Sequence, residues 1–453
     1  MILTENTFCS KICMCTRTKG VFGMKMNFDF PTQIATPIIT SIYTADPSAR
    51  LGPDGRMYIY CSHDCYPKGG NSLFGSMDHY HVFSSSDLVE WRDEGEILSS
   101  DDVEQGLPHG DFMWAPDCVY KNGKYYFYFP HPNQDPWYAN FQTFVAVSEH
   151  PAKDFKVLGY VEGIGGDGMI DPCLFIDDDG RNYLYYGGCG KAFCIELADD
   201  MITPIGEIHV LEGLADYHEG PWVFKRNGLY YMSYPDNHPG KNRMCYAVAA
   251  NPFGPWESKG AYLAPTGSGT THGSVTEMNG RWFCFYHNCA ISGDEWLRSV
   301  CVDELFFDEQ GKILPVEQTN FPVSPAGEPT LKGESHTYSP LLARLGGGAT
   351  AGEQAAKISQ EGQFVQLKKI DGGKGGRAVL SFTCSRIGKP CSFTLLVNGK
   401  NYGGVNVMPG TIYSPSTATF TVPLQAGKTN QVGVEFLDGE LELLQLQTEF
   451  LDA

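Results

Sequence analysis

The chain has 453 residues and a formal net charge of −20, with 42% hydrophobic, 13% aromatic and only 19% charged residues. This length allows two or three domains of about 150 residues each, and the apolar content excludes a predominantly disordered chain. The negative charge argues against nucleic acid and an anionic membrane surface as partners, whereas a neutral sugar meets no such repulsion. The aromatic content, with 52 glycines and 28 prolines, favours β-strands joined by turns.

Residues 1–28 are interpreted as an N-terminal extension that is either not native or disordered, because Met24 and Met26 are alternative starting points. This segment has no apolar stretch of signal-peptide length, and no later run approaches the roughly 20 residues of a membrane span. The 15 cysteines include no CxxC pair, which favours buried thiols in a reducing compartment. We therefore expect a cytoplasmic protein; a periplasmic or secreted location is the alternative if the N-terminus is wrongly assigned.

A hairpin recurs five times between residues 29 and 325. In each copy an Asp-Gly or Asn-Gly turn, which supplies the positive φ angles of a tight hairpin, precedes an aromatic-rich strand. The five turns are Asp54-Gly55, Asn122-Gly123, Asp179-Gly180, Asn227-Gly228 and Asn279-Gly280. Successive glycines are 48 to 68 residues apart, a spacing that suits four-stranded blades. The pattern predicts an all-β fold in which residues 29–325 form a five-bladed β-propeller; a long β-sandwich is the alternative.

The segment 326–340 has the composition of a linker, with Pro329 and Pro340 among Ser and Gly residues. Beyond it, residues 341–453 contain short β-patterned runs such as AVLSFTCS and TATFTVPL. Turns at Asn398-Gly399 and Asp438-Gly439 separate runs of this kind. The pattern predicts a second domain, a jelly-roll-like β-sandwich.

Three acidic residues share one position relative to the repeated turns. Asp46, Asp171 and Glu219 each precede the turn of their own repeat by eight residues, whereas Asp117 precedes its turn by only five. Taken singly, each has an ordinary explanation, an Asp-Pro turn for the two aspartates and a surface charge for the glutamate. The shared spacing instead predicts that equivalent inner-strand positions direct three carboxylates at the propeller axis, where like charges raise one another's pKa.

Residues 34–320, approximately, resemble glycoside hydrolase family 43, five-bladed propellers that act on arabinose- and xylose-containing glycans. The segments that carry the resemblance are ADPSAR, HVFSSSDLVEW, MWAPDCVYKNGKYYFYF, IDPCLFIDDDGRNYLYYGG, HEGPWVFKRNGLYYMSY, NPFGPW and THGSVTEMNGRWFCFYH. The resemblance implies that Asp46 is the general base, Glu219 the general acid, and Asp171 the residue that orients the acid and raises its pKa. An inverting glycosidase needs such an acid and base on opposite sides of the sugar, about 6.5–9.5 Å apart.

The resemblance also implies supporting residues. Trp114 is a candidate stacking wall for a sugar, with core packing as the ordinary alternative, and Arg298 is a candidate donor to sugar hydroxyls. His272 resembles the histidine near the family's central calcium or water site, although a lone histidine is more often a core residue. The C-terminal domain resembles carbohydrate-binding module family 6 through QAGKTNQVGVEFLDGELELLQLQ. It has no tryptophan, so packing on the propeller to complete the active-site rim is the alternative to sugar binding.

The sequence therefore predicts an inverting hydrolase of the α-L-arabinofuranosidase/β-xylosidase type, with an oligosaccharide or polysaccharide of the arabinoxylan class as its partner. We expect no required cofactor, with a structural calcium at the propeller centre as an option. Loops at residues 65–80 and 130–141 favour exo action. The alternatives are an endo-acting arabinanase or xylanase of the same fold and a non-catalytic sugar-binding propeller. A fructan-active relative is disfavoured because no WMNDPNG-like segment surrounds Asp46.

Overall fold

The computed structural model describes residues 37–66, 76–107, 112–133, 141–166, 168–239, 241–319, 335–385 and 388–451. The predicted N-terminal extension, residues 1–28, lies outside these ranges. Within them the regular elements are β-strands and two short 3-10 helices, η3 (Ser100–Asp102) and η5 (Pro340–Leu342), so the expected all-β class is confirmed. Neither of these described helices is long and apolar enough to cross a membrane.

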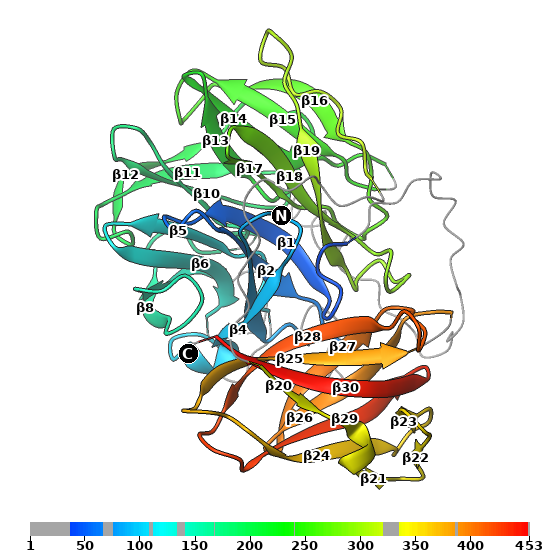
Figure 1. Cartoon of the computed structure of the whole chain (residues 1–453). Helices are drawn as coiled ribbons and strands as arrows, with labels where there is room; N and C mark the ends of the chain where they lie inside the picture. The colour runs from blue at the N-terminus through cyan, green and yellow to red at the C-terminus, as the bar shows by residue number, and fades with distance from the viewer. Residues whose placement is uncertain are drawn as a thin grey trace, which may run out of the picture.

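Five antiparallel sheets, here called blades 1 to 5, follow one another along the chain (Figure 1). Within each blade, hydrogen-bonded neighbours are also neighbours in sequence. Blade 1 contains β1 (Thr44–Leu51), β2 (Met57–His63), β3 (His79–Ser85) and β4 (Arg92–Ser99). Blade 2 contains β5 (Asp117–Lys121), β6 (Lys124–Pro132), β7 (Phe141–Ser148) and β8 (Lys156–Tyr160). Blade 3 contains β9 (Cys173–Ile176), β10 (Asn182–Tyr186), β11 (Phe193–Leu197) and β12 (Pro204–Val210). Blade 4 contains β13 (Trp222–Arg226), β14 (Leu229–Pro235), β15 (Met244–Ala249) and β16 (Glu257–Leu263). Blade 5 contains β17 (Ser274–Met278), β18 (Arg281–Asn288) and β19 (Ser299–Leu305).

The blades close into a ring. The first strands of the blades contact one another in the order β1, β5, β9, β13 and β17, and β17 in turn contacts β1. Residues ahead of and at the start of β1 bond to the last strand of blade 5 and to the residue before it: the amides of Ile38 and Thr44 donate to the carbonyls of Val300 and Arg298, at 2.8 Å each. This cyclic order of five blades is the propeller that the spacing of the hairpins predicts.

The five repeated turns lie between the first and second strands of the blades, as predicted. In the three Asn-Gly turns both residues have positive φ; Asn122 and Gly123, for example, have φ of 51° and 83°. In the two Asp-Gly turns only the glycine does, with φ of 79° at Gly55 and 85° at Gly180. The Asn-Gly turns are therefore the two-residue hairpins, and the Asp-Gly turns are longer connections.

Tyrosines in the second strands of blades 1 to 4 join each of these blades to the part of the chain that follows it, which explains the aromatic character of the repeat. Their hydroxyls donate to main-chain carbonyls of the following blade or of the segment after it. The pairs are Tyr60 to Pro151 (2.8 Å), Tyr128 to Met201 (2.6 Å), Tyr185 to Pro252 (2.8 Å) and Tyr231 to Gly311 (2.9 Å). A buried tyrosine thus contributes apolar area to the inter-blade core while its hydroxyl is satisfied.

The C-terminal part consists of two further antiparallel sheets (Figure 1). One has the order β22-β23-β30-β25-β28, with β20 also paired to β30, and the other has the order β21-β24-β29-β26-β27. The strands are β20 (Ser335–Tyr338), β21 (Arg344–Gly346), β22 (Thr350–Ala351), β23 (Ala356–Ile358), β24 (Phe364–Ile370), β25 (Gly376–Ser385), β26 (Cys391–Val397), β27 (Lys400–Val407), β28 (Ser416–Leu424), β29 (Asn430–Asp438) and β30 (Leu441–Phe450).

The predicted linker, residues 326–340, is shorter than expected at its C-terminal end. Residues 335–338 form β20, and their register with β30 runs from Ser335 opposite Glu449 to Tyr338 opposite Leu446. The aromatic and β-branched residues of SHTY suit a strand, and the proline-rich composition that suggested a linker belongs to residues before it. Residues 326–334 lie outside the described part of the chain.

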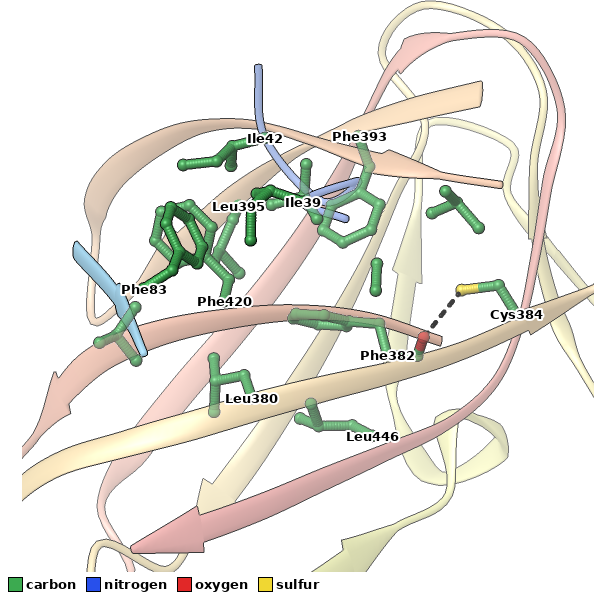
Figure 2. Packing of buried hydrophobic residues seen from close by; sticks show 14 of the residues in the cluster. Ile39, Ile42, Phe83, Leu380, Phe382, Cys384, Phe393, Leu395, Phe420 and Leu446 are labelled. Atoms are coloured by element: carbon green, nitrogen blue, oxygen red, sulfur yellow. Dashed lines mark hydrogen bonds between the residues drawn. The ribbon is translucent and has the colours of Figure 1, made fainter. Parts of the chain in front are cut away.

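The ring and the C-terminal sheets share one buried core. Phe382 of β25 and Phe393 of β26 lie 4.9 Å apart between the two sheets, and Phe420 of β28 belongs to the same cluster as Ile39 and Phe83 of the ring (Figure 2). Hydrogen bonds cross the same boundary. The amide of Thr421 donates to Asp93 at 2.8 Å, and the amide of Asn406 donates to the Ser41 carbonyl at 2.7 Å. The C-terminal sheets are therefore packed against blade 1 rather than tethered to it.

Candidate active site

Asp46 lies in β1 at a break in the strand register. The pairing with β2 shifts between Ala45 and Ser48, and Asp46 has a φ of 52°, a left-handed conformation that is uncommon for residues other than glycine. This local bulge directs the buried carboxylate out of the sheet pattern. The Ser62 hydroxyl on the neighbouring strand donates to Asp46 Oδ2 at 2.7 Å, which fixes one side of the carboxylate.

Arg298 pairs with the other side of that carboxylate. Its Nη1 lies 3.1 Å from Asp46 Oδ1, while Nε and Nη2 form a two-pronged pair with Asp64 at 2.9 and 2.8 Å. Burial, the largest single effect, raises the pKa of Asp46, but Arg298, the two neighbouring histidines and the Ser62 hydrogen bond together outweigh it, and the pKa falls to about 2. Asp46 is therefore a carboxylate that stays ionised throughout the range in which an enzyme works.

Asp171 and Glu219 form a second acidic group. Asp171 lies just before β9, is 4% exposed and has a φ of 56°. The amide of Gly220, the residue after Glu219, donates to the Asp171 carboxyl group, so the two acids are held side by side. Burial, followed by the charge of Glu219, raises the pKa of Asp171 well above its usual range. Glu219 is more open, with a side chain 19% exposed and His218 Nε2 at 3.7 Å from it.

His272 connects the two acidic groups. Its Nδ1 lies 3.8 Å from Asp46 Oδ1 and 3.9 Å from Asp171 Oδ2, and its ring packs against the backbone of Gly220, where a Cβ would lie only 3.0 Å from the ring. Burial lowers the pKa of His272, which favours the neutral imidazole between the two acids. The structure thus brings Asp46, Asp171 and His272 together and places Glu219 beside Asp171.

The surroundings of His272 do not fit a calcium ion held by protein side chains. Calcium takes six to eight oxygen ligands. The part of the chain that the structure describes contains no group of three or more His, Cys, Asp or Glu residues that could hold a metal ion. A calcium ion beside His272 would therefore need main-chain or water oxygens as further ligands, and a metal role for His272 stays a prediction.

Trp114 lies in an aromatic cluster next to Asp46. Its ring is stacked on Phe141 at 5.0 Å and meets Phe112 edge-on at 5.6 Å, and the side chain is half-buried. The amide of the following residue, Ala115, donates to Ser62 Oγ at 2.7 Å, so this segment is linked to the serine that holds Asp46. Packing therefore accounts for the position of Trp114, and its contact with a sugar stays a prediction.

Asp117, which does not share the eight-residue spacing, is bound to partners of its own. It accepts hydrogen bonds from Ser48 at 2.6 Å and from two nitrogens of Arg50 at 2.9 and 2.6 Å. The Arg50 guanidinium also donates to the Leu174 carbonyl at 2.8 Å and lies 4.0 Å from the centre of the Trp222 ring. Asp117 and Arg50 therefore join blades 1 to 4 as a structural ion pair.

The geometry corrects the explanation of the shared eight-residue spacing. Asp46 lies within its strand, whereas Asp171 and Glu219 precede β9 and β13 by two and three residues. The three acids are therefore not at equivalent strand positions, although two of them converge on His272. Sequence reasoning also missed Ser62 and Asp64. Both belong to the segment YIYCSHD, where a charged residue directly after an aromatic strand was the available signal.

The site contains an ionised carboxylate, held by an arginine, and a second carboxyl group whose pKa is raised. Such a pair is typical of hydrolases that use acid–base catalysis. Comparison with known proteins specifies the class. Residues 34–313 match the model of glycosyl hydrolases family 43, and the chain belongs to this family of glycoside hydrolases.

Known relatives agree with this membership. The chain is 36% identical over 335 residues to xylosidase/arabinosidase 43A of Humicola insolens, which covers 61% of this chain and 98% of the relative. A solved family 43 β-xylosidase/α-arabinofuranosidase from a compost microbial metagenome, in complex with xylotriose and in a calcium-free form, is 31% identical. That match has a TM-score of 0.56 and covers 62% of this chain and 96% of that one.

A third similarity extends into the C-terminal sheets. The structure of a family 43 arabinoxylan arabinofuranohydrolase from Bacillus subtilis covers 92% of this chain and 99% of that one, with a TM-score of 0.54. At 23% identity this is a likeness of fold alone.

Proposed function

We propose that this protein releases arabinofuranose or xylose from arabinoxylan- or arabinan-type glycans by an inverting mechanism. The observation that carries the proposal is the contrast between two neighbouring carboxyl groups: the pKa of Asp46 is about 2, while that of Asp171 is raised by burial and by Glu219. The name of the Humicola insolens relative, a xylosidase/arabinosidase, supports these two sugars as the products.

In this mechanism Asp46 is the general base. Its ionised carboxylate, fixed by Ser62 and Arg298, accepts a proton from water as the water attacks the anomeric carbon. Glu219, the most open of the three acids, donates a proton to the departing glycosidic oxygen. Asp171 orients Glu219 through the Gly220 amide, and its own charge state changes how readily Glu219 gives up the proton.

Most of the hydrogen-bonding groups of Arg298 are already used within the protein. Three of its nitrogens are engaged by Asp46, Asp64 and Thr270 at distances of 2.8 to 3.1 Å. Nη2 carries two protons, and one of them is directed at Asp64 Oδ1. We propose that the second proton contacts a sugar hydroxyl, and that the main task of Arg298 is to keep Asp46 ionised.

The test is hydrolysis of nitrophenyl α-L-arabinofuranoside and nitrophenyl β-D-xylopyranoside side by side, with proton NMR of the first-formed sugar. We expect release of nitrophenol from at least one of them. Inversion requires that the α-arabinofuranoside first give the β-anomer and the β-xyloside the α-anomer. A first product of retained configuration would mean a covalent intermediate and would remove Asp46 from the role of base. Hydrolysis of neither substrate, with cleavage of linear arabinan or xylan, would favour the endo-acting alternative.

For the C-terminal sheets we propose a jelly-roll-like β-sandwich related to carbohydrate-binding modules of family 6. A hollow of about 510 Å³ lies on the sheet that contains β24 and β29. Its lining suits the hydroxyl groups of a neutral sugar and includes Arg344, Phe364, Gln366, Asn398, Gln425, Gln431 and Glu435.

This second role predicts retardation of the protein in native gels that contain soluble arabinoxylan. The measurement uses the Glu219→Gln variant, so that the polysaccharide is not degraded during the run. We expect Gln431→Ala in that background to reduce the retardation several-fold. Gln310→Ala, at an exposed position of the ring, is the matched control and should leave it unchanged. Equal retardation of both variants would remove the hollow from sugar binding.

A further inference from the structure

His287 is a buried histidine that makes two directional hydrogen bonds at the back of the active site. It lies in β18, the middle strand of blade 5, opposite Val300 of β19, and its side chain is fully buried. The main-chain N–H of Asp46 donates to His287 Nδ1 at 3.0 Å, and His287 Nε2 lies 2.8 Å from the carbonyl oxygen of Thr270. Because β18 is paired on both sides, it provides a rigid platform for these contacts.

These two partners determine the protonation of the ring. A peptide N–H can only donate and a carbonyl oxygen can only accept, so Nδ1 must carry a lone pair and Nε2 must carry the proton. Burial lowers the pKa of His287 to about 3, and the Arg298 charge adds to this effect, while Asp46 opposes it. The titratable and charged side chains that act on the His287 ring are Arg298, Asp46 and His272. The imidazole of His287 is therefore neutral, with its single proton on Nε2, and it is unsuited to transferring a proton in the reaction.

The contacts form a closed circuit around Asp46. Thr270 accepts from His287 through its carbonyl and from Arg298 Nη1 through its hydroxyl, the latter at 3.1 Å. Arg298 Nη1 in turn holds Asp46 Oδ1 at 3.1 Å. One arm of the circuit thus fixes the carboxylate of Asp46 and the other fixes its backbone. The backbone needs such support, because a φ of 52° is a strained conformation for a residue that is followed by proline.

We propose that His287 is a positioning residue for the general base, holding the Asp46 main chain in its left-handed conformation so that the carboxylate faces the attacking water. The proposal rests on the proposed function, since it presumes that Asp46 is the base. It assigns no proton transfer to His287. A shift of about 1 Å in the carboxylate would be enough to lower the rate by about 100-fold, because the attack geometry depends on it.

Two amide substitutions separate this role from simple packing. In His287→Asn the amide oxygen can occupy the place of Nδ1 and accept from the Asp46 N–H. In His287→Gln the longer side chain brings its amide to the place of Nε2, where it can donate to Thr270. Gln fills the buried site better than Asn, so a packing role ranks Gln above Asn in both Tm and kcat. A positioning role ranks Asn above Gln in kcat.

The experiment measures kcat, KM and Tm of both variants on the nitrophenyl glycoside that the wild type hydrolyses. We expect His287→Gln to lose about 100-fold in kcat with little change in KM, and His287→Asn to stay within about tenfold of the wild type. The proposal would be overturned if the kcat of His287→Gln equalled or exceeded that of His287→Asn. It would also be overturned if the fall in kcat simply followed the fall in Tm. Asp46→Asn is measured in parallel. If Asp46→Asn is inactive and the two His287 variants have equal kcat, only the role of His287 is overturned. An active Asp46→Asn, or a wild type without activity, would overturn the roles of both Asp46 and His287.

A spectroscopic measurement tests the tautomer without reference to activity. In protein labelled with ¹⁵N-histidine, the His287 signals are those lost in His287→Asn. We expect an unprotonated Nδ1 and a protonated Nε2 from about pH 5 to pH 8. A doubly protonated ring, or the opposite tautomer, would contradict the hydrogen bond from Asp46 and with it the proposal.

Discussion

Asp46→Asn and Glu219→Gln are each expected to lower kcat by roughly 10²- to 10⁴-fold on a natural disaccharide substrate, while the protein stays folded. The physical reason differs between the two. The amide that replaces Asp46 could not accept the proton of the attacking water, and the amide that replaces Glu219 could not give one to the leaving oxygen. Glu207→Gln is the control, because Glu207 is exposed on β12, away from both acidic groups, and should leave kcat unchanged.

The leaving group distinguishes the two roles. A dinitrophenolate leaves without protonation, so Glu219→Gln should regain most of its lost rate on the dinitrophenyl glycoside. Asp46→Asn should remain slow on both substrates, because water must still be activated. If both variants recovered equally with the better leaving group, Asp46 and Glu219 would not have the separate roles of base and acid. Either variant with the turnover of the wild type would remove that residue from the mechanism.

Asp46→Asn also has an expected cost in stability. The pKa of Asp46 is about 2 in the folded protein against 3.8 as the reference, so the ionised form stabilises the fold above pH 3.8 and this contribution is lost as the pH falls through about 2. At neutral pH the difference amounts to about 2 kcal/mol. Since Arg298 keeps its two-pronged pair with Asp64, the variant should remain folded, with a lower Tm at pH 7 and an unchanged Tm near pH 2.

The sequence was sufficient for the ring because its signals are local. Asn-Gly turns and tyrosine-rich strands act within a few residues, and five copies of the same unit identify the architecture. The linker boundary was less accurate because β20 is defined by its partner β30, more than 100 residues further along the chain. Likewise Asp46, Asp171 and Glu219 could be proposed from spacing and resemblance, but nothing in the spacing indicates that Asp171 is more buried than Glu219.

The supporting contacts of the site could not be read from the sequence for a related reason. Asp46 and Arg298 are 252 residues apart, and Asp46 and His287 are 241 apart. Both pairings exist because the ring closes blade 5 against β1, which brings the two ends of the propeller together. The geometry of a blade can be predicted from one repeat, whereas the partner that a side chain meets across the closure depends on the whole ring.

Asp171→Asn is expected to make the protein more stable at neutral and alkaline pH while lowering its activity strongly. Burial and the charge of Glu219 raise the pKa of Asp171 in the folded state above its unfolded value of about 3.8. Between these two pKa values the folded protein binds a proton that the unfolded chain does not. Stability therefore declines as the pH rises from the unfolded pKa through the folded one, and the deficit persists above it.

Asparagine removes this penalty, because it is neutral at every pH and its amide oxygen can still accept from the Gly220 N–H. The expected result is a higher Tm than wild type at pH 8, and a difference that disappears below about pH 4, where Asp171 is protonated in both states. Asp46→Asn, with the opposite shift, is the matched control and should lose stability over the same range. Thermal unfolding of the wild type, Asp171→Asn and Asp46→Asn from pH 3 to pH 9 measures the expected gain and the expected loss in Tm.

The same series tests the role of Asp171 in catalysis. If Asp171 modulates Glu219, the pH–rate profile of Asp171→Asn should change on the limb that reports the acid, in addition to the fall in kcat. An Asp171→Asn protein that is less stable than wild type at pH 8 would mean that the carboxylate is ionised and paired in the folded state. In that case the contrast between Asp46 and Asp171, on which the proposed division of labour rests, would have to be abandoned, because the site would contain two stabilised anions instead of one.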